Sequence, residues 1–315
     1  MSLSDGSSVS RVTLLLQLLA IGAGLASAQR FAYFDAPNSV LTVAYGINSR
    51  GDFVGYYDDT NHRRHGFLVQ NGAFTSIDAP SSGPANFAGT VAYSINSNND
   101  MVVFGYNVYS GDQHYYVLSS GAYTPIVVPG SSYFVALGIN NTGDIVGTYM
   151  ATADGRQHGF KLSAGVVTTL DVPGAVYTYA SGINNRGDIV GWFESPSSPF
   201  PQVGFLWHNG SYTTYAGPGP CQNTYPPGTL ATASDTVLTG INDPGEIVGG
   251  YNDGVQNNIG GFYSYSLTIT NGRLTPVTIP GAQQSAAEGI NDGGTIVGSY
   301  YDGSDHLHGY IFSGR

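Results

Sequence analysis

The chain has 315 residues, with 10 Lys or Arg against 21 Asp or Glu, and its formal net charge is −11. Affinity for nucleic acid depends on cationic side chains that neutralise phosphates, so this balance excludes a nucleic-acid partner. The single cysteine, Cys221, excludes an internal disulfide framework. It falls in a Pro- and Gly-rich loop, where we interpret it as an isolated thiol.

The N-terminal segment has the pattern of an export signal. An apolar run at 12–21 follows Arg11, and Ala26-Ser27-Ala28 supplies the small residues at which a signal peptidase cuts. The run is shorter than the roughly 20 residues of a membrane-spanning helix. We therefore expect residues 1–28 to be a signal peptide cleaved near Ala28. Residues 29–315 would then form one exported domain, secreted or periplasmic, without a membrane span.

A repeated phrase organises the rest of the chain. Gly-Ile-Asn, or Ser-Ile-Asn in one copy, occurs six times, at 46–48, 94–96, 138–140, 182–184, 240–242 and 289–291. Each copy is followed by patterns typical of further short strands. In the fourth copy we predict four strands, at 178–183, 188–192, 204–207 and 212–215. A period of 44 to 58 residues between phrases, with several strands in each, predicts the blades of a β-propeller.

The two ends of the chain predict how the repeats close. The last copy stops after its third strand, at 308–312, and the N-terminal segment 31–37 reads as a fourth strand with no repeat of its own. If this strand completes the last blade, no sheet edge is left open. A linear solenoid would need capping repeats at both ends. The sequence therefore predicts an all-β, six-bladed β-propeller of four-stranded antiparallel blades, closed by its N-terminal strand.

The repeat also resembles a known family. The closest stretch runs from His158-Gly159-Phe160 through the segment 171–174, Asp-Val-Pro-Gly, to the phrase at 182–191. This pattern is similar to the repeats of the bacterial extracellular proteins called the HAF family, and the similarity covers essentially all of residues 29–315. The resemblance implies an extracellular repeat protein and supplies no activity to transfer. The fifth copy departs from the pattern, with Gly260 for His and Thr278 for Asp.

A histidine recurs at the start of the third strand of several copies. Counting back from the hairpin turns places each of three histidines opposite an aspartate, in the pairs His65–Asp78, His158–Asp171 and His308–Asp35. Side chains directly opposed across strands lie about 5 Å apart. We predict a structural hydrogen bond in each pair; the alternative is a catalytic dyad or a metal site. Equivalent positions on separate outer strands cannot converge on one metal ion. We therefore expect no metal and no cofactor.

Two turns contain the tripeptide Arg-Gly-Asp, at 50–52 and 186–188. The same positions in the other copies keep a turn but change the first residue. We interpret the tripeptide as a part of the repeated turn, because so short a match is weak support for an adhesion ligand.

Ligand-binding residues are expected on one end of the propeller. The connections between second and third strands, and from one blade to the next, vary in length, and the longest is the insertion 217–234 around Cys221. Variable loops on a rigid scaffold commonly carry function. Five aromatic residues near these loops are our candidates for ligand binding: Tyr56, Tyr149, Trp192, Tyr251 and Tyr300. The alternative is that they pack between blades.

Two classes of function follow from this arrangement. We favour a non-catalytic binding or scaffold module, expected to be a monomer, that presents the loop-rich end to a glycan, a peptide or a surface protein. The alternative is a propeller hydrolase or lyase with its site in the central pocket. Such an enzyme needs an acid or base at the axis, and the only glutamates are Glu194, Glu246 and Glu288. We assign no catalytic residue, because one fold hosts many functions.

Overall fold

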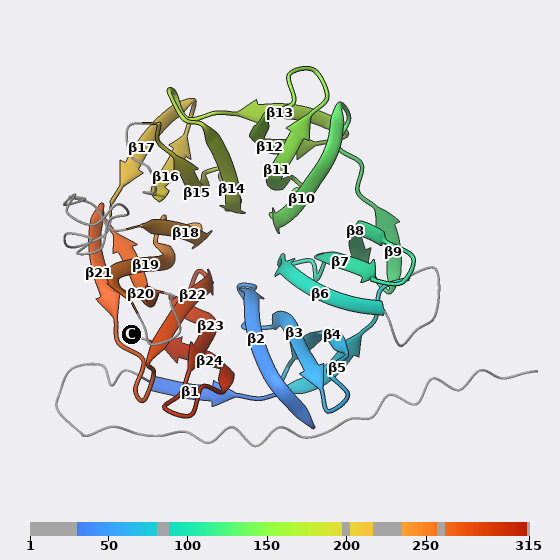
Figure 1. Cartoon of the computed structure of the whole chain (residues 1–315), viewed down its shortest axis with the longest axis vertical. Coiled ribbons are helices and arrows are strands. Elements are labelled where there is room, and N and C mark those ends of the chain that lie inside the picture. Colours follow the sequence, from blue (N-terminus) through green and yellow to red (C-terminus); the bar gives the residue numbers. More distant parts are fainter. Residues whose placement is uncertain (1–29, 81–87, 197–201, 217–234, 257–261, 314–315) are drawn as a thin grey trace, which may run out of the picture.

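The computed structural model describes residues 30–80, 88–196, 202–216, 235–256 and 262–313. In these segments 24 strands form six four-stranded antiparallel sheets, and the sheets stand in a ring around a central axis (Figure 1). The predicted six-bladed β-propeller is confirmed. The predicted signal peptide and Cys221 with its insertion lie outside the described residues.

Blades 1 to 5 run outward from the axis in the order in which their strands occur along the chain, and blade 6 does so except for its outermost strand, which is the first of the chain. Blade 1 contains β2 (Ser39–Ile47), β3 (Phe53–Asp59), β4 (Arg64–Gln70) and β5 (Ala73–Ile77). Blade 2 contains β6 (Ala88–Ile95), β7 (Met101–Asn107), β8 (Asp112–Ser119) and β9 (Ala122–Pro125). Blade 3 contains β10 (Ser131–Ile139), β11 (Ile145–Ala151), β12 (Gln157–Ser163) and β13 (Val166–Leu170).

The remaining blades follow the same plan. Blade 4 contains β14 (Tyr177–Ile183), β15 (Ile189–Glu194), β16 (Gln202–His208) and β17 (Ser211–Tyr215). Blade 5 contains β18 (Thr236–Ile241), β19 (Ile247–Gln256), β20 (Phe262–Thr270) and β21 (Arg273–Val277). Blade 6 contains β22 (Gln284–Ile290), β23 (Thr295–Tyr301) and β24 (Leu307–Ser313), completed by β1 (Arg30–Phe34). The four strands predicted for the fourth copy are all present, with ends displaced by at most two residues.

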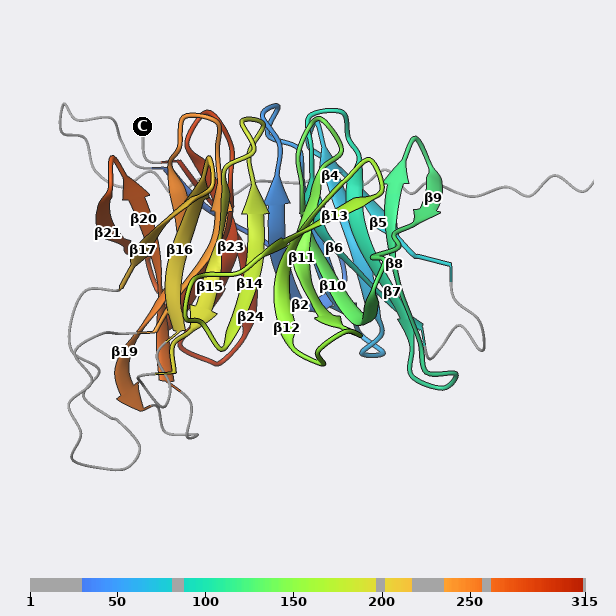
Figure 2. The same ribbon diagram turned by 90° about the horizontal axis from the view of Figure 1, so that it is seen from above.

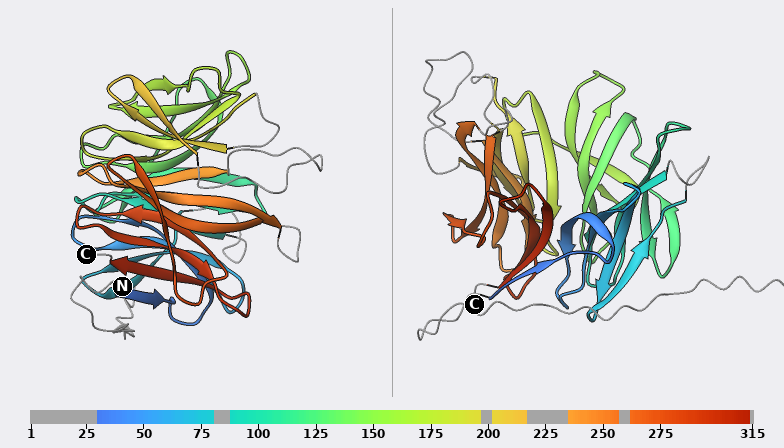
Figure 3. Two further views of the ribbon diagram at one scale, coloured as in Figure 1. Left: turned by 90° about the vertical axis from the view of Figure 1, so that its left-hand side faces the viewer. Right: turned by 60° about the horizontal axis from the view of Figure 1, so that its bottom comes forward.

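The N-terminal strand closes the ring. Strand β1 pairs antiparallel with β24, with Phe31 opposite Phe312, so the first and last strands of the chain lie side by side (Figure 3). The Phe34 side chain is buried and lies 5.2 Å, between ring centroids, from Phe53 of blade 1. The first strand therefore completes the last blade and also joins the core that blade 6 shares with blade 1, as the strand count predicted.

The hydrophobic cores lie between successive blades. One core, for example, combines Val146 and Leu170 of blade 3 with Ile183 and Phe205 of blade 4. A large side chain in the third strand of a blade is fully buried in five of the six copies: Phe67, Phe160, Phe205, Leu267 and Tyr310. Burial of such side chains contributes roughly 1.5–3 kcal/mol each. The repeated aromatic or leucine therefore holds each blade against its neighbour.

Glycine in the repeated phrase lets the innermost strands approach each other. A Cβ atom on Gly182 would lie 2.7 Å from the carbonyl oxygen of Thr239 in the next blade. Four more of these glycines face the backbone of the next blade in the same way. The exception, Ser94, is accommodated because its Oγ accepts a hydrogen bond of 3.3 Å from the backbone N–H of Ile139. The phrase therefore needs a small residue here because backbones meet at the axis.

The propeller has two different ends (Figure 2). We call the end that carries the short turns after the first and third strands of each blade the turn face. The opposite end, with the longer connections after the second and fourth strands, is the loop-rich face. Among the described residues no helix is long and apolar enough to cross a membrane.

Candidate functional site

A ring of asparagines closes the turn-face end of the axis. In each blade the Asn of the repeated phrase donates through Nδ2 to the main-chain oxygen of the Asn in the next blade. The six bonds measure 2.9–3.3 Å and join Asn48 to Asn96, Asn96 to Asn140, Asn140 to Asn184, Asn184 to Asn242, Asn242 to Asn291 and Asn291 to Asn48. The circuit returns to its start, so these buried amides tie all six blades together at one level.

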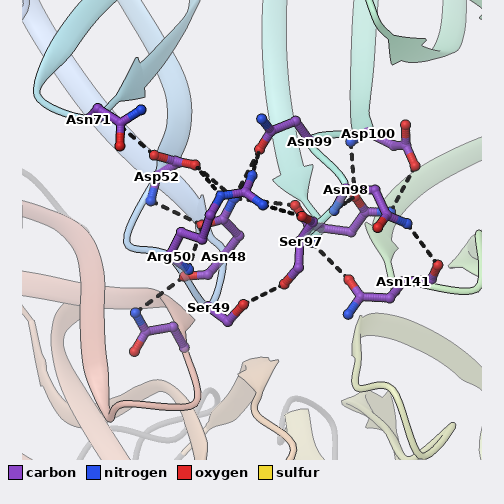
Figure 4. Close-up of polar contacts among 12 residues, drawn as sticks. Asn48, Ser49, Arg50, Asp52, Asn71, Ser97, Asn98, Asn99, Asp100 and Asn141 are labelled. Carbon is purple, nitrogen blue, oxygen red and sulfur yellow. Dashed lines mark hydrogen bonds and ion pairs between the residues drawn. The ribbon is translucent and has the colours of Figure 1, made fainter.

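The same asparagine also organises its own turn (Figure 4). Asn48 Oδ1 accepts from the backbone N–H groups of Arg50 and Asp52, at 3.0 Å each. The Asp52 side chain accepts in turn from Asn48 and Arg50 and is only 2% exposed. Local side-chain bonds of this kind stabilise turns. In blades 1 and 4, Arg-Gly-Asp is therefore a structural turn whose aspartate is buried.

Behind the asparagines, a second ring lines the axis itself. We call the six residues that precede the repeated phrase the axial ring: Tyr45, Tyr93, Leu137, Ser181, Thr239 and Glu288. Together with the backbone of the phrase they surround a cavity of about 100 Å³. Since one water occupies about 30 Å³ of liquid, this space suits a few waters or one small chemical group.

Glu288 is the one carboxyl group in the axial ring. Its side chain is half-buried and is exposed only where it lines the cavity. Within the described segments no hydrogen bond or ion pair reaches its carboxyl group. Burial disfavours the charged form and raises the pKa of Glu288 to about 8. At pH 7 this carboxyl group is therefore mainly protonated.

Aromatic side chains extend from Glu288 toward the loop-rich face. In the axial ring, the ring of Tyr45 lies 5.3 Å from that of Tyr93 and 5.7 Å from that of Tyr56. The Arg64 guanidinium lies 4.1 Å above the Tyr56 ring, and Asp58 holds it with two bonds of 2.8 and 3.0 Å. Burial and the nearby charge of Glu288 raise the pKa of Tyr45. Blade 1 therefore links a paired guanidinium on the loop side to the carboxyl group at the axis.

Blades 3 and 4 contribute aromatic residues on another side of the axis. Tyr179 and Trp192 stack face to face, with centroids 3.8 Å apart and planes 11° from parallel. Tyr133, which is 51% exposed, lies on β10, the innermost strand of blade 3. We call this set the aromatic belt: Tyr45, Tyr56, Tyr93, Tyr133, Tyr179 and Trp192.

The five aromatic residues selected from the sequence divide into two groups. Tyr56 and Trp192 lie in the aromatic belt. Tyr149 and Tyr300, each 8% exposed, lie in the cores between blades, and Tyr251 packs against another such core. For these three residues the structure gives the packing arrangement that was the alternative: each lies one position further along its strand than Tyr56 and Trp192 do, and therefore on the other face of its blade.

Hydrogen bonds join all three His–Asp pairs. Nδ1 of the histidine lies 2.7 Å from the carboxylate in His65–Asp78, and 2.9 Å in both His158–Asp171 and His308–Asp35. Each Nε2 also faces a second aspartate, which lies at the end of the second strand or in the loop after it. The distances are 3.2–3.6 Å in the pairs His65–Asp59, His158–Asp154 and His308–Asp302. This second aspartate is absent from the sequence-based prediction.

These histidines lie far out on the blades and pack against an aromatic ring. The His65 ring stacks on Tyr57, with centroids 5.2 Å apart. The hydrogen bond that His65 donates to Asp78 raises the pKa of His65 against the opposing effect of burial. Each Asp–His–Asp set therefore joins the end of the second strand, or the loop after it, to the end of the fourth strand, and the sets belong to different blades. Among the described residues no group of three or more His, Cys, Asp or Glu is arranged to hold a metal ion.

Comparison with known proteins finds similarity in structure alone. No protein-family model and no curated protein sequence matches the chain. A variant of the Aleuria aurantia lectin in complex with Fucα1-6GlcNAc has a TM-score of 0.51 at 11% identity, over 87% of this chain and 93% of the lectin. AofleA from Arthrobotrys oligospora has a TM-score of 0.46 at 12% identity, over 93% of this chain and 88% of AofleA. TolB from Acinetobacter baumannii has a TM-score of 0.49 at 12% identity, over 88% of this chain and 64% of TolB. The likeness to the Aleuria lectin supports the propeller fold.

Proposed function

We propose that this chain is an exported, non-catalytic binding module that holds a glycan at the loop-rich end of its axis. The observation that carries the proposal is the aromatic belt, in which six aromatic side chains lie on the two innermost strands of four successive blades. Aromatic faces stack on the apolar C–H faces of sugar rings, and the polar ends of Tyr and Trp bond to hydroxyl groups. Export is supported by the N-terminal pattern and the resemblance to extracellular repeats.

The charges near the belt narrow the class of glycan. Arg64 is neutralised by its two bonds to Asp58, and Glu288 has a pKa of about 8. The whole chain carries a net charge of −11, which repels acidic ligands at long range. A glycan without carboxylate or sulfate groups therefore fits the site better than an acidic polysaccharide. The Aleuria lectin is a propeller that was captured with a disaccharide, although at 11% identity the argument here rests on the belt.

A glycan array with residues 29–315 tests the proposal. We expect binding to non-acidic glycans, and at least tenfold weaker binding by Tyr56→Ala and by Trp192→Ala. Tyr33→Ala is the matched control, because Tyr33 is an exposed tyrosine on the outermost strand of blade 6. Thermal unfolding of each variant shows whether it is folded. If the protein bound no glycan on the array, the proposal would be overturned. Binding to peptides or to a protein instead would show a binding module with a different class of ligand.

One observation favours a second candidate, a hydrolase or lyase acting at the axis. A carboxyl group with a raised pKa is suited to general acid catalysis. Glycoside hydrolysis ordinarily needs two carboxyl groups that flank the bond, and the axial ring contains only Glu288. Turnover of an array-positive glycan by the wild type, lost in Glu288→Gln, would establish the enzyme in place of the binding module.

A further inference from the structure

The axial cavity contains one carboxyl group, that of Glu288, which makes no hydrogen bond to the described part of the propeller. The equivalent position is an uncharged residue in the other five blades, and in blade 6 it is Glu288. The Glu288 side chain is partly exposed to the cavity and has no hydrogen-bond partner among the described residues, so a ligand that brings a donor can bind there. The closed asparagine ring shows that buried amides on this axis are otherwise bonded. Glu288 is the one carboxyl group among the six side chains of the axial ring.

The surroundings of Glu288 select a positive partner. Tyr45 and Tyr56 both lie near enough for the Glu288 charge to raise their pKa values, after the larger effects of burial and, for Tyr56, of Arg64 and Asp58. The faces of tyrosine rings attract cations. Because a cation stabilises the ionised form, a carboxyl group that lines one cavity together with Tyr45 is a site for a cation. Arg64 does not fill this role, because its guanidinium lies over Tyr56 and pairs with Asp58.

The size of the cavity selects the kind of cation. About 100 Å³ has room for an ammonium group. The hydroxyl groups of Ser181 and Thr239 also line the cavity. Thr239 donates its hydroxyl proton to the main-chain oxygen of Ala287 at 2.7 Å, which leaves oxygen lone pairs as acceptors. Three N–H donors of a primary ammonium group can thus meet a carboxylate and hydroxyl oxygens.

From this geometry we infer that the axial cavity receives a primary amino group of the bound glycan, so that the ligand class is a glycan with free amines. The sugar rings stack on the aromatic belt, and one amino group enters the cavity and pairs with Glu288. This inference rests on the proposed function, since the belt must hold the rest of the ligand. The net charge of −11 favours a basic ligand at long range.

The experiment compares two probes that differ only in their amines, a glucosamine tetramer and its fully N-acetylated counterpart. We expect the wild type to bind the free-amine tetramer at least tenfold more tightly at pH 6.5. The preference should fall below threefold in Glu288→Gln and persist in Leu137→Ala, a change in the same ring that removes no polar group. Thermal unfolding confirms that both variants fold. Ammonium chloride and potassium chloride serve as further arms, to separate an amine presented by a sugar from a free cation.

The possible outcomes separate the inference from the proposed function. Equal binding of the two tetramers, or a preference that survives in Glu288→Gln, would overturn the inference and leave glycan binding standing. If ammonium or potassium ions alone stabilised the protein against thermal unfolding, and the two tetramers bound equally well, the inference would also be overturned in favour of a free-cation site. Failure of both tetramers and of every other glycan would contradict the proposed function as well.

Discussion

At the scale of single residues, His65 shows how one side chain joins the end of the second strand of a blade to the end of its fourth strand. Its ring is bonded to Asp78 at the end of the fourth strand, faces Asp59 at the end of the second strand and stacks on Tyr57. His114 occupies the same repeat position in blade 2, but it is exposed, and its counterpart of Asp78 is Val127, which is exposed too. The two histidines therefore make a matched pair for measuring the effect of the aspartates.

We expect His65→Ala to lower the free energy of unfolding by about 1–3 kcal/mol, because it removes a charge-assisted hydrogen bond and a ring contact. His114→Ala should change it by less than about 0.5 kcal/mol. Chemical denaturation at pH 6 measures both. Equal effects of the two substitutions would show that the aspartate pairs do not stabilise the fold.

The His65 contribution should depend on pH. Its pKa is raised in the folded state, so its stabilisation is complete below the unfolded value of about 6.5 and declines as the pH rises through the folded value. Asp78, whose pKa is lowered by His65 and Arg63 against the larger effect of burial, stays ionised across this range. The stability difference between wild type and His65→Ala should therefore be larger at pH 5.5 than at pH 9. A difference independent of pH would contradict the charged pairing.

Glu288 should act on stability in the same direction through a different cause. The unfolded glutamate ionises near pH 4.5, whereas the folded one has a pKa of about 8. Between these values the unfolded state holds fewer protons, so the stability of the wild type should fall as pH rises. At pH 9 we expect Glu288→Gln to exceed the wild type by about 1–3 kcal/mol, and to match it near pH 4.5. Stability curves for the two proteins that run parallel from pH 4.5 to 9 would refute the raised pKa; Ser181→Ala is the control.

At the scale of elements, the propeller depends on how closely the innermost strands approach. Gly182 in β14 abuts Thr239 of β18, whereas a Cβ atom on Gly250 in β19 would find its nearest neighbour at 3.6 Å, an ordinary contact. Neither glycine has a positive φ. The pair therefore separates the need for space at the axis from the general effect of replacing glycine.

We expect Gly182→Ala to lower the free energy of unfolding by about 1–3 kcal/mol, because the added methyl group overpacks the axis. Gly250→Ala should be neutral or slightly stabilising, since it reduces the entropy of the unfolded chain. Urea titration of both variants provides the comparison. A neutral Gly182→Ala would show that the blades can separate at the axis at no cost.

The same elements explain which parts of the site could be predicted from the sequence. Hairpin turns fix strand register, so the pairing of His65 with Asp78 followed from counting residues. The second aspartate did not, because the loops differ in length: Asp154 lies four residues before His158, and Asp59 lies six before His65. The alternation of side chains between the two faces of a strand also did not predict which residues line the axial ring. Tyr45 and Glu288 lie at β-bulges, marked by register shifts between Ala44 and Gly46 and between Ala287 and Gly289, where the inward and outward alternation is interrupted.

At the scale of the whole molecule, the ring and its closure were predictable because they follow from counting. Six phrases and one unpaired N-terminal strand account for every blade, and β1 pairs with β24 as that count requires. The site was not predictable in the same way, because it gathers one or two residues from each of several blades. Tyr56, Tyr93 and Trp192 come from three different copies, and only the ring brings them to one axis. A search for variation at one repeat position, the residue before the repeated phrase, is the signal that would have found Glu288.

The central claim, that a glycan binds at the aromatic belt, can be tested with the two tryptophans of the chain. Trp192 stacks on Tyr179 in the belt, and Trp207 lies in the third strand of the same blade, opposite Tyr212. In Trp207→Phe the fluorescence reports on Trp192 alone, and in Trp192→Phe on Trp207 alone. On titration with a glycan selected by the array, the account predicts a saturable change in emission from Trp192 and none from Trp207. Saturable binding that leaves the emission of Trp192 unchanged would contradict it.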